Sequence, residues 1–382
     1  MGVFAGPKVV SDGLVLSLDP GNIFKSVDST SNNFLQNGSF AGGLGVTYEQ
    51  GSNPTNTIIE LENPGDSNYV LRQNGSNTEY QMNIDGGAQG TLSASTQYVM
   101  SGWYATSDDY NGGDTMFHAR AYSTGGSHNA TGNGIGTLLY SVEIGGLTWE
   151  YRYQTITTPS DYSGDFDWYM GYGTTNTTGY RYYTGLKVEE GSFPSLLDLS
   201  RNGNDAKVIN GTSYSSANGG SLVFDGSDDY ISSVSIPNPN GELTCEVAIN
   251  YDSKGAYHNI FDRGSSRPML WIDFNNKLEV SFSTASGGIT SSDAYNGQDI
   301  VVTAVYNSNS SPGILLYVNG NLVGTQNTTH VTWANPSTFT LFNRSNSQTF
   351  DGKLYYLKFY TKALTALEIQ QNFNALRGRF GI

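Results

Sequence analysis

Short runs in which apolar and polar residues alternate occur throughout this chain of 382 residues. Leucine occupies every second position of residues 14–18, and apolar residues do the same in 278–282 and 300–304. Because side chains of a strand point alternately to its two faces, this period predicts half-buried antiparallel strands. Asn319-Gly320 follows another apolar run and supplies the positive φ angles of a tight hairpin turn. The chain is therefore predicted to consist mainly of β-strands.

One segment near the C-terminus has helical rather than strand spacing. Thr365 and Glu368 form a capping box, and apolar residues follow three and four positions apart, which predicts a helix over 366–376. The aromatic content of 13% is enough for a core, and the 47 glycines fit turns between many short strands. With this length, the sequence predicts an all-β protein of two β-sandwich or jelly-roll domains and one short C-terminal helix.

Charge and segment composition exclude several classes of function. The net charge of −15 argues against partners that are polyanions, namely nucleic acid and anionic membrane surfaces. No apolar run reaches transmembrane length, so membrane insertion is not expected. The first residues lack the pattern of a secretory signal, so release by lysis within a particle is expected. The single cysteine, Cys245, lies in an alternating run and is predicted to be a small core residue.

Three segments of the second half are similar to a known domain type. They are residues 198–205 with 219–231, the hairpin at 317–320, and residues 350–382. Together they resemble a laminin-G-type, concanavalin A-like lectin domain of the sort common in phage structural proteins. Residues 10–22 resemble the opening strand of the same domain, so the resemblance implies a discontinuous domain of residues 1–29 plus 196–382. A loop insertion costs little, because loop-closure entropy grows only logarithmically.

The inserted residues 30–195 resemble a different domain type. Residues 33–40, 95–103, 149–155 and 184–190 are similar to a jelly-roll carbohydrate-binding module of the kind attached to xylanases and glucanases. In that family a carboxylate that follows the opening motif helps to hold a structural calcium. In this chain Ala41 and Gly42 occupy that position, so the carboxylate that would help to bind this calcium is missing.

Aromatic residues of the inserted module are the candidate sugar contacts. Trp149, Tyr151 and Tyr153 alternate and therefore share one face of a strand, where rings can stack on sugars. The alternative is that these rings face inward and form the core of the jelly roll. The predicted carbohydrate-binding residues are Trp103, Tyr104, Trp149, Tyr151, Tyr153 and Trp168.

An acidic turn in the second half is the candidate metal site. Asp225, Asp228 and Asp229 are closely spaced, and calcium prefers several oxygen ligands, so a structural calcium is one interpretation. The alternative is a turn whose carboxylates accept hydrogen bonds from local amides. No paired-carboxylate pattern of the glucanases is present, so no catalytic residue and no enzymatic activity are expected.

These features and the resemblance together predict a non-enzymatic virion surface protein of a bacteriophage. We expect a tail-fibre, head-fibre or appendage component on the particle exterior, which contacts other virion proteins and attaches to host surface polysaccharide. The alternative is a structural decoration or appendage subunit that uses its lectin-like folds only for virion protein contacts. Because multivalency strengthens weak sugar binding, we expect a homo-oligomer, most simply a trimer. The apolar pairs of Met1–Val10 are candidate contacts, the alternative being a disordered tail.

Overall fold

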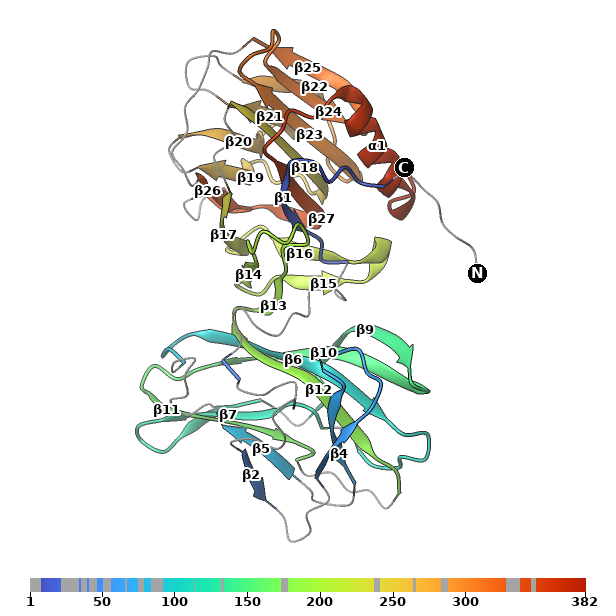
Figure 1. Cartoon of the computed structure of the whole chain (residues 1–382). Coiled ribbons are helices and arrows are strands. Elements are labelled where there is room, and N and C mark those ends of the chain that lie inside the picture. The colour runs from blue at the N-terminus through green and yellow to red at the C-terminus, as the bar shows by residue number, and fades with distance from the viewer. Residues whose placement is uncertain are drawn as a thin grey trace. The chain divides into compact units, whose positions relative to one another are not determined.

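A computed structural model gives the fold of the chain (Figure 1). The structure describes residues 8–21, 34–35, 40, 47–50, 56–65, 67–74, 79–83, 92–113, 115–131, 134–172, 178–236, 241–263, 266–282, 288–327, 337–344 and 348–382. The chain divides into two compact units: unit 1 is Met1–Ser26 with Ser195–Ile382, and unit 2 is Val27–Pro194. Both are built from strands, which confirms the predicted all-β class.

Unit 1 contains two sheets of eight strands. In sheet A the order is β15-β16-β27-β18-β23-β24-β25, with β1 also paired to β27. Its strands are β1 (Leu14–Leu18), β15 (Ser213–Ser215), β16 (Ser221–Asp225), β18 (Glu242–Tyr251), β23 (Ile300–Asn307), β24 (Ile314–Val318), β25 (Asn321–Gln326) and β27 (Asp351–Tyr360). In sheet B the order is β13-β14-β17-β26-β19-β20-β21-β22. Its strands are β13 (Phe193–Leu196), β14 (Ala206–Ile209), β17 (Tyr230–Ile236), β19 (His258–Arg263), β20 (Ser266–Ile272), β21 (Lys277–Ser281), β22 (Ile289–Ala294) and β26 (Ser337–Leu341).

Strand β1 joins the early and late parts of the chain. It runs antiparallel to β27, with Leu16 opposite Phe359 and Leu18 opposite Leu357, and Figure 1 shows the blue strand beside the red one. Leu16 and Leu18 are fully buried. The leucine face of β1 therefore completes the core of unit 1, as its alternation predicts.

Aromatic side chains of both sheets meet in the core of unit 1. The ring of Phe359 in sheet A lies 5.1 Å from that of Phe261 and 5.0 Å from that of Phe339, both in sheet B. Cys245 lies opposite Phe359 in the register of β18 with β27, and it is fully buried. This confirms Cys245 as a core residue.

Two local predictions for unit 1 are also confirmed. Asn319 and Gly320 have φ angles of 51° and 75° and connect β24 to β25, as the hairpin signal requires. Helix α1 spans Ala366–Leu376, and its capping box is complete. The hydroxyl of Thr365 accepts from the Glu368 amide at 3.3 Å, while the Glu368 carboxylate accepts from the Thr365 amide at 2.9 Å. The 3₁₀ turns Ala217–Gly219 and Arg377–Arg379 complete the helical structure of the described residues.

Helix α1 covers a buried polar network on the outer face of sheet A. Glu246 is fully buried and accepts from Lys358 Nζ at 3.2 Å and from Asn372 Nδ2 at 3.1 Å. Asn372, on α1, also accepts from the backbone amide of Val10 at 2.8 Å. A buried ion pair is stable only while the hydrogen-bonding partners of both charged groups are in place.

The N-terminal segment corrects one expectation. Val10 is buried against Ile369 and Leu364 of its own chain, and Gln371 donates to the carbonyl of Lys8. Val10 is therefore a core residue of unit 1 and is not available for contacts between copies, whereas the prediction of a homo-oligomer is not tested by this packing. Residues 1–7 lie outside the described residues.

Unit 2 contains two further sheets. Sheet C has the order β3-β4-β12-β6-β10-β9, and sheet D has the order β2-β5-β11-β7-β8. The strands of sheet C are β3 (Thr57–Glu60), β4 (Tyr69–Gln73), β6 (Gln97–Thr106), β9 (Thr137–Ile144), β10 (Leu147–Thr157) and β12 (Arg181–Glu190). The strands of sheet D are β2 (Thr47–Gln50), β5 (Glu79–Asn83), β7 (His118–Ser123), β8 (His128–Ala130) and β11 (Tyr162–Met170).

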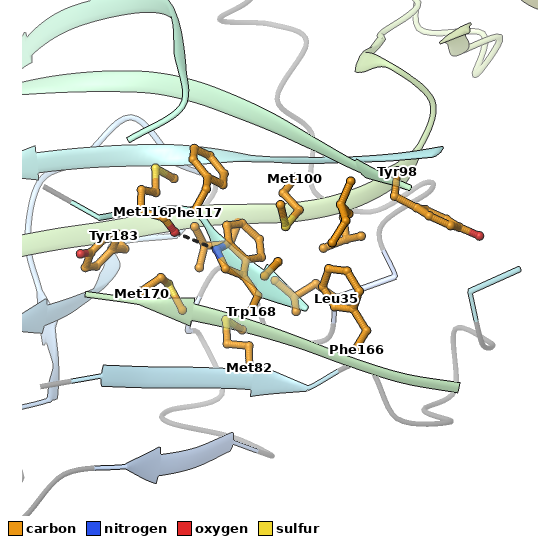
Figure 2. Packing of buried hydrophobic residues seen from close by; sticks show 14 of the residues in the cluster. Leu35, Met82, Tyr98, Met100, Met116, Phe117, Phe166, Trp168, Met170 and Tyr183 are labelled. Atoms are coloured by element: carbon orange, nitrogen blue, oxygen red, sulfur yellow. Dashed lines mark hydrogen bonds between the residues drawn. The ribbon is translucent and has the colours of Figure 1, made fainter. Parts of the chain in front are cut away.

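Trp168 lies at the centre of the core of unit 2 (Figure 2). Its ring stacks on Phe117 at 5.5 Å with an interplanar angle of 14°, and its Nε1 donates to the carbonyl of Met116 at 2.8 Å. Figure 2 shows Met100 and Phe166 around it, from sheets C and D respectively. Because strand side chains alternate, the neighbours of these residues in sequence lie on the outer faces of the two sheets.

Candidate functional site

The aromatic ladder of β10 lies on the outer face of sheet C. Tyr151 is opposite Trp103 in the register of β10 with β6, so the two rings share this face and lie 5.1 Å apart. Yet Trp103 and Trp149 are 0% exposed and Tyr151 is 1% exposed. The turn between β3 and β4 reaches this face, since a Cβ atom at Gly185 would lie 3.2 Å from Trp103 and 3.9 Å from Gly65.

The remaining predicted aromatic residues are also packed against protein. Tyr104 and Trp168 belong to the core between sheets C and D, where they are 3% and 0% exposed. Tyr153 is half-buried against Phe193, with ring centroids 5.3 Å apart. The expectation that Trp103, Tyr104, Trp149, Tyr151 and Trp168 contact sugar is therefore corrected. Other parts of the protein cover the faces of these rings, so no ring face is left for a ligand.

A second group of aromatic and polar side chains lies on the outer face of sheet D. Ala119 and Ala121 of β7 and Phe166 and Trp168 of β11 point into the core, so the residues between them point outward. We call this outward group the Tyr–Arg face. It consists of Gln81, His118, Arg120, Tyr122, Asp167, Tyr169 and Tyr172.

Asp167 is the acceptor at the centre of the Tyr–Arg face. One of its carboxylate oxygens accepts from the hydroxyls of Tyr122 at 3.0 Å and Tyr169 at 2.9 Å. The other oxygen accepts from Gln81 Nε2 at 2.8 Å. Burial, and then the hydrogen bond to Asp167, raise the pKa of Tyr169 above its usual value. The three hydrogen bonds together fix the position of the Asp167 carboxylate.

Arg120 is the cation of the Tyr–Arg face, and it is held by tyrosines. Its guanidinium lies 5.3 Å from the ring centroid of Tyr169 and 5.4 Å from that of Tyr172. One of its nitrogens donates to the Tyr172 hydroxyl at 3.1 Å. The ring of Tyr172 stacks on His118 at 3.8 Å with an interplanar angle of 10°. The result is an ordered set of donors, a carboxylate acceptor and supported rings, the combination with which proteins orient sugar hydroxyls.

Sequence reasoning missed the Tyr–Arg face, although one signal was present. In 118–122, alanine alternates with His118, Arg120 and Tyr122, a pattern of small core residues beneath large polar ones. Arg120, Tyr122 and Tyr172 are half-buried, as is Asp167, so parts of these side chains remain accessible. The face thus combines order with access, which the buried ladder of sheet C lacks.

The geometry of the acidic turn in unit 1 fits both interpretations, a calcium site and a turn whose carboxylates accept hydrogen bonds from local amides. Oxygens of Asp225, Asp228 and Asp229 lie within 4.8 Å of one another, which fits the oxygen donor set that calcium prefers. Two of the carboxylates also bond local amides: Asp225 accepts from Ser227 at 2.8 Å and Asp229 accepts from Asp225 at 3.0 Å. The hydrogen bonds of the amide-capping interpretation are present, the three carboxylates are the residues that would hold an ion, and calcium binding stays a prediction.

Replacing Asp229 with asparagine tests the charge balance of the acidic turn. Burial, with the charges of Asp225 and Asp228, raises the pKa of Asp229 to about 6. The carboxyl group of Asp229 therefore stabilises the folded protein fully below pH 3.8, which is its pKa in the unfolded chain. This stabilisation is lost as the pH rises through 6. In chelator at pH 7.5, Asp229→Asn should raise the free energy of unfolding by up to about 3 kcal/mol, and at pH 3.5 it should not.

Thermal unfolding of both proteins with chelator and with millimolar calcium measures this. Burial lowers the pKa of the nearby His258 to about 4, but this effect is common to both proteins and cancels in the comparison. If the turn holds calcium, the ion stabilises the wild type and not Asp229→Asn. A wild type that gains no stability from calcium would exclude the metal interpretation.

Comparison with known proteins identifies the fold of unit 1. Residues 225–370 match the family model of the concanavalin A-like lectin/glucanases superfamily, laminin G type. This part of unit 1 is therefore similar to concanavalin A-like lectin domains. The match includes the acidic turn, the hairpin at 317–320 and residues 350–370, and it leaves out residues 10–22 and 198–205. No curated protein sequence matches the chain.

Several solved structures are similar to about half of this chain. One is a mutant of Trypanosoma rangeli sialidase displaying trans-sialidase activity (15% identity, TM-score 0.39, 50% of this chain and 32% of that one). Another is the binding domain of Paraclostridial Mosquitocidal Protein 1 (15%, 0.39, 47% and 49%). A third is the binding domain of botulinum neurotoxin serotype D/C VPI 5993 (19%, 0.40, 49% and 50%). The chain therefore spans half or less of each.

No helix within the described residues is long and apolar enough to cross a membrane. The assignment of unit 2 to a carbohydrate-binding module family stays a prediction.

Proposed function

We propose that this protein is a non-enzymatic, glycan-binding component of a bacteriophage virion surface, and that the Tyr–Arg face of unit 2 contacts the glycan. The observation that carries the proposal is the network around Asp167, in which two tyrosine hydroxyls and one amide hold the carboxylate acceptor in place near a half-buried arginine. Tyrosine side chains lose little conformational entropy when they are ordered in a binding site. Their rings can pack on the apolar face of a sugar, and their hydroxyls can form hydrogen bonds with the sugar hydroxyls. The lectin-like fold of unit 1 and the neutral polar surface agree with an extracellular binding role.

The virion setting rests on the resemblance of the concanavalin A-like half to phage structural proteins. In this setting the protein lies on the particle exterior, contacts other virion proteins and binds host surface polysaccharide as a homo-oligomer. We further propose that calcium, where it binds, shapes the acidic turn of unit 1 and takes no part in chemistry. Labelling of phage particles by an antibody against the chain tests the location.

Replacing Tyr172 with alanine should weaken glycan binding about tenfold, because the mutation removes a supported ring and a hydroxyl from the proposed contact surface. The measurement is binding of the full-length protein to immobilised host capsular and lipopolysaccharide glycans. Tyr257→Ala is the matched control, because Tyr257 is an exposed tyrosine of unit 1, 37% accessible, and lies outside the Tyr–Arg face. If both variants bind like the wild type, or if the wild type binds no glycan, the structural-subunit function takes the place of this proposal.

The same incubations test the non-enzymatic part of the proposal. Glycoside hydrolysis requires a pair of carboxyl groups that flank the scissile bond, whereas both oxygens of the Asp167 carboxylate already accept hydrogen bonds from neighbouring side chains. We expect no new reducing ends after prolonged incubation with the bound glycan. Release of oligosaccharide that depends on the protein would show that it is an enzyme.

A further inference from the structure

We propose that the Tyr–Arg face recognises a sugar that carries a carboxylate, so that the ligand is an acidic polysaccharide of the uronic-acid type. This inference rests on the proposed function and names the ligand class of the same site. It starts from the surroundings of Arg120.

Arg120 has no carboxylate partner among the residues that the structure describes, although one stands directly opposite it. Asp167 is the register partner of Arg120 on the neighbouring strand, where opposite charges ordinarily pair. Instead the guanidinium bonds to Tyr172 and lies over the rings of Tyr169 and Tyr172. In contrast, Arg152 pairs with Glu150 at 2.8 Å and Arg379 pairs with Asp19 at 2.9 Å.

The tyrosines keep Asp167 and Arg120 apart. Tyr122 and Tyr169 direct their hydroxyls to one oxygen of Asp167, and Gln81 donates to the other. The carboxylate is thereby supplied with donors that carry no charge. Among the described residues, no carboxylate forms an ion pair with Arg120, whose partners are the tyrosines.

A ligand carboxylate would complete this arrangement. A guanidinium binds a carboxylate through two parallel hydrogen bonds, which are stronger and more directional than bonds to a neutral hydroxyl. Tyr172 adjoins Arg120 and is backed by His118 at 3.8 Å, so its ring is already fixed for contact with the sugar that carries the acid. The net charge of −15 repels long polyanions at a distance, so the preference must come from this local contact.

The test compares full-length protein binding to alginate and polygalacturonate with binding to the same polymers after chemical reduction of their carboxyl groups. We expect the acidic forms to bind at least about tenfold more tightly, as a charge-assisted pair implies. Arg120→Gln should remove this difference by weakening binding of the acidic forms to the level of the reduced ones. Arg152→Gln is the matched control and should keep the difference, because Arg152 lies in sheet C and has Glu150 as its partner.

Two further measurements keep the test decisive. Arg120→Lys retains the charge and should bind the acidic forms with intermediate affinity, and its thermal unfolding shows whether unit 2 remains folded. Competition with short glucuronate-containing and glucose oligosaccharides uses the wild type alone, and only the acidic one should displace the polymer. If the reduced polymers bind as well as the acidic ones and Tyr172→Ala weakens both, the acid preference is wrong while glycan binding stands. If the wild type binds neither form of any polymer, the proposed function itself fails.

Discussion

Replacing Glu246 with leucine is expected to lower the free energy of unfolding of unit 1 by about 3–5 kcal/mol. The mutation leaves the Lys358 ammonium, 6% exposed, without its carboxylate beneath helix α1. It also removes the acceptor of Asn372, which holds the backbone of Val10. Cys245 is the only cysteine of the chain and is fully buried. Its labelling rate with a thiol reagent in increasing urea therefore measures the opening of unit 1 alone.

The double mutant Glu246→Leu with Lys358→Met provides the control. Replacing both members of a buried ion pair by apolar residues of similar size often restores stability, because no uncompensated charge remains. We expect the double mutant to regain most of the loss caused by Glu246→Leu. If Glu246→Leu alone labels at the same urea concentration as the wild type, the network does not stabilise unit 1.

Replacing Trp168 with alanine is expected to destabilise unit 2 by about 3–5 kcal/mol, because the mutation leaves a large cavity between sheets C and D. Trp168→Phe keeps a ring on Phe117 but leaves the carbonyl of Met116 without its donor, so a smaller loss of about 1–3 kcal/mol is expected. Hydrogen exchange of the amides of β6 and β11 measures both effects within the full-length protein.

The same pair of variants separates a core residue from a binding residue. Labelling of Cys245 should be unchanged in both, because Trp168 belongs to unit 2 and Cys245 to unit 1. A Trp168→Ala protein that keeps wild-type hydrogen exchange but loses glycan binding would contradict the core assignment. It would return Trp168 to the predicted sugar contacts.

Features set by neighbouring residues could be predicted from the sequence. The hairpin at Asn319-Gly320 depends on local φ angles, and helix α1 depends on the capping box of Thr365 and Glu368. The alternation of β1 likewise predicted a buried face. In each case the determining residues lie within a few positions of one another, so periodicity and turn chemistry are sufficient.

Features set by distant residues could not be predicted in this way. The ladder of Trp149 and Tyr151 lies on one strand face as its spacing predicts, but which face is covered depends on other segments of the chain. Asp167 meets Gln81 and Tyr122 because β11 lies between β5 and β7, a strand order that no local pattern encodes. The candidate site could therefore be recognised only once the strand order was known. Its residue types alone do not distinguish it from an ordinary solvent-facing side of a sheet.

The pairing of β1 with β27 also imposes an order on biosynthesis. A ribosome makes Leu14–Leu18 first and must then complete all of unit 2 before it reaches Asp351–Tyr360. At ordinary bacterial translation rates this takes roughly 20–60 s. During that time the leucines of β1 have no partner strand, while unit 2 has all its residues and can fold. The core of unit 1 is therefore incomplete until β27 has been made, and a chaperone that shields β1 would have to act after unit 2 is complete.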